Sequence, residues 1–72
     1  YMQSPRDIYE PLTATEKQVL QLLAQGLTYH EMADKLGKKE GSIKFHSSGI
    51  FKKLQVKNRQ QAVNRAVEIG LL

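Results

Sequence analysis

The chain of 72 residues contains no cysteine and no tryptophan, and it has only two histidines. Without cysteine, neither a disulfide framework nor a thiolate metal site can supplement the core. His30 and His46 are not joined to a carboxylate cluster by a regular metal-ligand spacing, so we expect no structural zinc. No apolar stretch approaches the roughly 18 residues of a membrane-spanning helix, and no signal-peptide pattern is present. A reducing, cytoplasmic setting is consistent with this composition.

Catalytic patterns are also missing from the sequence. There is no glycine-rich phosphate loop and no constellation of nucleophile and base, and so small a domain leaves little room for a dry pocket. We therefore expect no enzymatic activity and no cofactor. The first residue is Tyr1 rather than Met, so we expect this single domain to be part of a longer protein.

Positive charge is concentrated in one segment of the chain. Between Lys38 and Arg59 the sequence has seven cations and one acid, Glu40, a local net charge of +6, whereas the remaining residues carry a net charge of −2. One interpretation is that this basic excess does no more than keep the protein soluble. Segregation on this scale favours a surface that contacts a polyanion.

Helix start and stop signals divide the chain. Both prolines lie in residues 1–11, which we interpret as an N-terminal arm or linker, and residues 12–72 form the folded domain. Three capping boxes predict helix starts, and a glycine follows each helical pattern. The boxes are Thr13–Glu16, Thr28–Glu31 and Asn58–Gln61, and the glycines are Gly26, Gly37 and Gly70. The domain is therefore predicted to be all-α.

The run Ser42–Leu54 predicts a two-faced helix. Its apolar stripe has the i, i+7, i+11 spacing of a buried face, at Ile43, Ile50 and Leu54. The opposite face mixes cations, an aromatic ring and a hydroxyl, at Lys44, Phe45, Ser48 and Lys52. A helix with that exterior suits a groove lined with phosphates and base edges.

The same helix is predicted to begin near Glu40 with a poor start. Lys39 at the cap position offers no acceptor, and Gly41 and Gly49 each cost about 1 kcal/mol relative to alanine in a helix interior. The glycines could allow close contact between helices. We favour the interpretation that small residues on the outward side let the backbone approach a partner.

The short second helix, the Gly37–Lys39 turn and this third helix form a helix-turn-helix. From Leu12 to Leu72 the chain resembles the DNA-binding domain of the LuxR/FixJ-type (NarL-type) bacterial transcription regulators. The resemblance rests on Leu12-Thr13-x-x-Glu16-x-x-Val19-Leu20, Gly26-Leu27-Thr28 with Glu31-Met32-Ala33, Ser42-Ile43-Lys44-x-His46, Ile50-Phe51-x-Lys53-Leu54-x-Val56 and Asn58-Arg59-x-x-Ala62-Val63.

This resemblance implies a four-helix bundle that contains the helix-turn-helix. It also implies double-stranded DNA as the partner and a third helix, about residues 40–54, in the major groove. Base-reading residues are implied at Lys44, Phe45 and Ser48. Phosphate contacts are implied at Thr28, Ser42, His46, Lys52, Lys53 and Arg59. The fourth helix would pair protomers into a homodimer through Ala62, Val63, Ala66 and Val67. The regulatory part that such an output domain serves, a receiver of a two-component response regulator, would lie outside this chain.

Some positions have a simpler structural interpretation. His46 borders the apolar stripe, so a packed core histidine and a phosphate contact are both open. Phe51 follows the apolar side and is expected in the core. Arg59 could belong only to the first turn of the last helix, and Thr28 could be occupied by capping. Tyr29 and His30 are expected to be exposed without a role.

Two other functions fit parts of the pattern. A sigma-factor-like promoter-reading domain would work within RNA polymerase, a partner that either interpretation allows, but the match beyond Asn58 favours the regulator. A protein-interaction module using the last helix is the second alternative, although its Ala and Val residues could simply close the core.

Overall fold

The computed structural model describes residues 11–72, so the predicted arm lies outside the described residues apart from Pro11. The described part contains four helices and no strand, which confirms the all-α prediction. The helices are α1 (Ala14–Ala24), α2 (Tyr29–Leu36), α3 (Glu40–Leu54) and α4 (Arg59–Glu68).

The first two capping boxes form as predicted. The Thr13 hydroxyl accepts a hydrogen bond from the Glu16 backbone N–H at 3.1 Å, and the Glu16 carboxylate accepts one from the Thr13 N–H at 2.9 Å. Thr28 and Glu31 repeat this arrangement at 3.1 and 2.8 Å. Each box satisfies two donors that a helix N-terminus would otherwise leave unpaired.

The third box forms only in part. The Asn58 side chain accepts from the Gln61 N–H at 2.9 Å, which caps α4 as predicted. The Gln61 side chain, however, accepts from the backbone N–H of Lys57, one residue earlier than a capping box requires. The longer reach still pairs a donor of the loop that leads into α4.

A residue in the left-handed backbone conformation follows each of the four described helices, and at three of them this residue is a glycine. Gly26 and Gly37 follow α1 and α2 with φ of +85° and +64°, as their positions predicted. At the end of α3 it is Gln55 that adopts the left-handed conformation, with φ of +58°. No glycine marks that end of α3.

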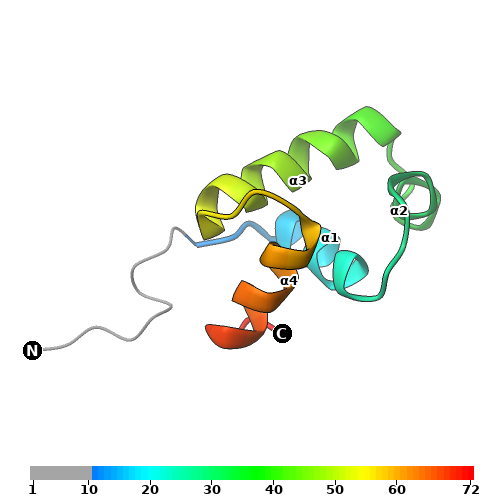
Figure 1. The fold of residues 1–72 in the computed structure, drawn as a ribbon. Coiled ribbons are helices and arrows are strands. Elements are labelled where there is room, and N and C mark those ends of the chain that lie inside the picture. Colours follow the sequence, from blue (N-terminus) through cyan, green and yellow to red (C-terminus); the bar gives the residue numbers. More distant parts are fainter. Residues whose placement is uncertain (1–10) are drawn as a thin grey trace, which may run out of the picture.

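Helix α3 is the centre of the packing, because it contacts each of the other three helices. Figure 1 shows it crossing one side of α1 and α4, with α2 beside its N-terminal end. The predicted inward stripe is confirmed, since Ile43, Ile50 and Leu54 are fully buried. The rest of the apolar core comes from the other three helices and their flanks, at Leu12, Val19, Leu20, Leu22, Leu23, Met32, Ala33, Ala62, Ala66 and Ile69. Burial of this core leaves the opposite face of α3 free for another task.

None of the described helices is both long and apolar enough to cross a membrane.

Candidate nucleic-acid interface

The outward face of α3 forms the centre of the candidate interface, and its four predicted members are exposed. Lys44, Phe45, Ser48 and Lys52 all lie in the exposed class, with Phe45 at 75% exposure. The Phe45 ring meets the ring of His46 edge-on, with centroids 5.7 Å apart. His46 is half-buried, between the core and the surface.

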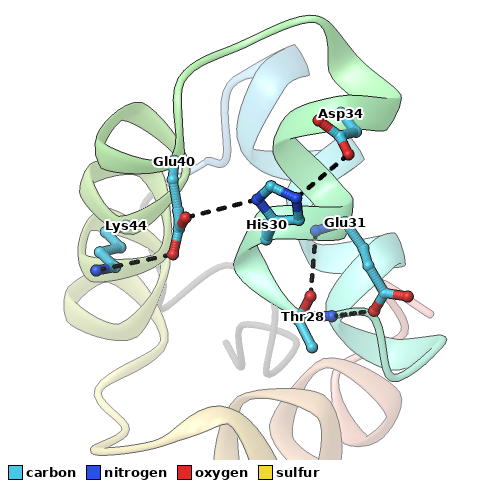
Figure 2. Close-up of polar contacts among 6 residues, drawn as sticks. All are labelled: Thr28, His30, Glu31, Asp34, Glu40 and Lys44. Atoms are coloured by element: carbon cyan, nitrogen blue, oxygen red, sulfur yellow. Dashed lines mark hydrogen bonds and ion pairs between the residues drawn. The ribbon is translucent and has the colours of Figure 1, made fainter.

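Charged side chains of α2 and α3 meet at the N-terminal end of this face (Figure 2). His30 Nδ1 lies 3.9 Å from Glu40 Oε2, and its Nε2 lies 3.6 Å from Asp34 Oδ2. Glu40 Oε1 is also 4.0 Å from Lys44 Nζ. His30 is 74% exposed, as expected, and its ring lies between Asp34 of α2 and Glu40 of α3.

Thr28 and Ser42 lie near this end of the interface. The Thr28 oxygen accepts the capping hydrogen bond from Glu31, which leaves its O–H free to donate to a phosphate. The backbone N–H of Thr28 is the main cause that lowers the pKa of the Glu31 carboxyl. Ser42 is exposed in the first turn of α3. Both hydroxyls are available as donors at the start of a helix.

Lys53 points into the bundle, unlike its neighbour Lys52. Its ammonium lies 2.7 Å from Glu16 Oε1 and donates to the Pro11 carbonyl at 3.2 Å. Burial raises the pKa of the Glu16 carboxyl, but hydrogen bonds from Lys53 and Thr13 and the charge of Lys53 together lower it below its ordinary value. We call Glu16, Lys53 and Gly49 the α1–α3 lock.

Gly49 belongs to this lock because it makes room for the carboxylate. A Cβ atom at position 49 would lie 2.8 Å from Glu16 Oε2, closer than real Cβ contacts allow. The interpretation that both glycines serve an outside partner is thus corrected for Gly49, where the close contact is between α1 and α3. At Gly41 a Cβ would meet nothing within 4 Å, so that position is open to a partner.

Arg59 is also used inside the domain. Its guanidinium donates to the Leu27 carbonyl and lies 5.7 Å from the centroid of the Tyr29 ring, a cation–π contact. Tyr29 is half-buried and packs against the core, so the expectation that it is exposed is wrong. Phosphate contacts by Lys53 and Arg59 stay predictions, and each would compete with these internal partners.

The four predicted dimer residues on α4 are divided between core and surface. Ala62 and Ala66 are fully buried within this chain, because the helix turns its small residues toward the bundle. Val63 is half-buried, and Val67 is 59% exposed. Of these four residues, the two valines are the ones that reach the surface of the domain.

The interface thus brings together one continuous face of α3 and the start of α2. No group of three or more potential metal ligands occurs among residues 11–72. Sequence reasoning missed Glu40 as a member of the face, although its position as the lone acid of the basic segment was a signal.

Comparison with known proteins agrees with this geometry. The family described as "Bacterial regulatory proteins, luxR family" matches residues 10–66. The transcriptional regulatory protein DesR of Bacillus subtilis (strain 168) is 43% identical over 67 residues, covering 89% of this chain and 34% of DesR. The response regulator protein VraR of Staphylococcus aureus (strain Mu3 / ATCC 700698) is 35% identical over 71 residues, covering 99% of this chain and 34% of VraR.

Two solved structures share the fold. The response regulator ChrA of a heme-sensing two-component system superposes with a TM-score of 0.84 at 38% identity, covering 88% of this chain and 31% of ChrA. The transcription factor GerE superposes with a TM-score of 0.79 at 30% identity, covering 85% of this chain and 91% of GerE. The chain spans about a third of the length of the curated relatives named above. From these matches and the helix-turn-helix geometry, the chain belongs to the luxR family of bacterial regulatory proteins.

Proposed function

We propose that this domain binds double-stranded DNA in a sequence-specific manner, as the output domain of a bacterial response regulator. The observation that carries the proposal is the exposed face of α3. Lys44, Phe45, Ser48 and Lys52 face outward from a helix whose other side is fully buried in the core. A helix of that kind fits the major groove, about 12 Å wide.

Each side chain of the face has a chemical role in this proposal. Lys44 donates to guanine O6 or N7, and the Phe45 ring packs against a thymine methyl. Ser48 reaches a base edge directly or through water. Lys52, Ser42 and Thr28 contact phosphates, which orients the domain on the duplex without reading sequence.

Protein partners follow from the same proposal. Val67, exposed at 59%, and half-buried Val63 would contact α4 of a second protomer, so that two domains occupy two half-sites. A regulator bound beside a promoter would also contact RNA polymerase. Acting on the chromosome places the protein in the bacterial cytoplasm.

Selection of bound duplexes from a random DNA pool, at stated salt, tests the function. We expect enrichment of one motif, and an affinity for it that falls with salt at a log–log slope of about −0.9 per phosphate neutralised. No enrichment together with a flat salt dependence would reject DNA binding. Sedimentation with and without the selected duplex separates the dimer from the monomer, and tight dimerisation without DNA binding would favour an interaction module instead.

A further inference from the structure

Glu40 is the one acid in the basic segment Lys38–Arg59, and it is the first residue of α3. Its side chain is 47% exposed at the end of the helix that carries Lys44 and Phe45. A carboxylate at this place opposes binding to a polyanion, since phosphate oxygens repel it. The position therefore needs a reason other than general affinity for DNA.

The Glu40 carboxylate lies at the turn between α2 and α3, beside two exposed side chains. One oxygen lies 3.9 Å from the His30 ring and the other lies 4.0 Å from the Lys44 ammonium, as Figure 2 shows. His30 and Lys44 are themselves 74% and 62% exposed. Long contacts between exposed side chains are worth little and are readily exchanged for others. The carboxylate and Lys44 are therefore adjacent, opposite in charge, and free to turn to another partner.

The major groove offers one base-edge donor that suits a carboxylate, the N4 amino group of cytosine, and it offers guanine acceptors that suit a lysine. We propose that Glu40 is a specificity-determining residue, which accepts a hydrogen bond from a cytosine N4 amino group while it penalises duplexes that lack one. Lys44, released from Glu40, then donates to a neighbouring guanine. This inference rests on the proposed DNA-binding function and adds to it a fourth base-reading residue, opposite in charge to Lys44.

A simpler role for Glu40 is to favour the N-terminus of α3, since acids in a first turn interact well with the helix dipole. The two roles differ in what a substitution changes. Loss of a dipole contact alters binding to every duplex by the same factor. Loss of a base contact alters the ratio between the preferred duplex and random DNA.

The test repeats the random-pool selection with the full chain and with three variants, and then measures affinity for the wild-type motif and for a random duplex. Glu40→Gln and Glu40→Ala remove the charge at the interface. Glu68→Gln makes the same change in net charge on α4, where Glu68 is 72% exposed and 4.0 Å from Arg65. It is the matched control.

We expect both Glu40 variants to bind the random duplex about twofold tighter or more, because one repulsive charge is gone. Their ratio of motif to random affinity should fall by about fivefold or more, the lower end of what one base contact supplies. Preference for cytosine should disappear at one motif position, and Glu40→Gln should shift it toward adenine, which glutamine reads. Glu68→Gln should keep the wild-type motif and ratio.

An unchanged motif, or a ratio within about twofold of wild type in both Glu40 variants, would overturn the inference while leaving DNA binding in place. A fall in the ratio without loss of a cytosine preference would overturn it as well. If the wild-type chain itself enriches no motif, the proposed function fails first, and the inference fails with it.

Discussion

The two ends of α3 are built differently. At its C-terminal end Lys53 is held by a buried carboxylate at 2.7 Å, and Gly49 lets that carboxylate in. At its N-terminal end Lys39 provides no side-chain cap, and the charged contacts of Glu40 are 3.9 and 4.0 Å long. Helix α3 is thus fixed to the domain at its C-terminal end, while the polar groups at its N-terminal end are exposed and weakly paired.

The largest effect on stability is expected from a substitution in the α1–α3 lock, at the C-terminal end of α3. Lys53→Met keeps the apolar stem but removes the ammonium, which leaves the Glu16 carboxylate buried with one partner fewer. We expect the free energy of unfolding to fall by about 2 kcal/mol, measured by urea denaturation. Lys52→Met, the matched control on the exposed side, should stay within about 0.5 kcal/mol of wild type. Equal losses in the two variants would mean that the lock does not stabilise the fold.

The second prediction concerns Lys44, near the N-terminal end of α3. Lys44→Ala should weaken binding to the selected motif by about 1–3 kcal/mol and change binding to random DNA little, because a base contact is lost rather than a phosphate contact. Stability should hardly change, since Lys44 is 62% exposed. Equal losses on both duplexes in a fluorescence anisotropy titration would show that Lys44 contacts only phosphate.

Local features of the structure could be predicted from the sequence, whereas contacts between distant residues could not. Capping residues and glycines act within a few positions and predict α1, α2 and α4, whereas the apolar stripe predicts α3 and its orientation. The lock joins Glu16 to Lys53, far apart in sequence, and a capping-box glutamate gives no sign that it will also accept a buried lysine. The stripe also missed Ser47, a hydroxyl buried in α3 with no hydrogen-bond partner among the described residues.

The site was predictable to a similar degree. Helical periodicity alone predicts the exposed face of α3, and its four members are indeed exposed. Charge alone could not separate Lys52 from Lys53, because a basic residue can point outward or pair inward. Which of the two happens depends on Glu16 and Gly49, and only the packing of α1 on α3 brings these together.

A third prediction concerns the effect of low pH on the contact between Glu16 and Lys53. The pKa of Glu16 and the pKa of Glu31 are both lowered from an ordinary value of 4.5 in the folded protein. A lowered folded pKa contributes stability above the ordinary value, and that contribution is lost as pH falls through the folded pKa. Urea midpoints should thus decline below about pH 4.5. Glu16→Gln should decline less steeply, and an unchanged slope in that variant would contradict the role of Lys53.

The smallest effect is expected from alanine at the two glycines of α3. Gly41→Ala meets open space and gains helix propensity, so the free energy of unfolding should rise by about 0.5 kcal/mol. Gly49→Ala gains the same propensity, but its Cβ would displace the Glu16 carboxylate from its place beside Lys53, so a net loss is expected. Urea denaturation of both variants measures the difference.

The same two variants should differ in DNA affinity as well, and there Gly41→Ala is expected to be the more damaging change for the folded domain. A methyl group at position 41 lies on the exposed first turn, where the backbone of α3 would approach DNA, so Gly41→Ala should stabilise the domain yet weaken its hold on the selected duplex. Gly49→Ala should weaken binding only as far as it unfolds the protein. If both variants are equally stabilised, the Glu16 carboxylate moves aside freely, and the C-terminal half of α3 is no more fixed than the N-terminal half.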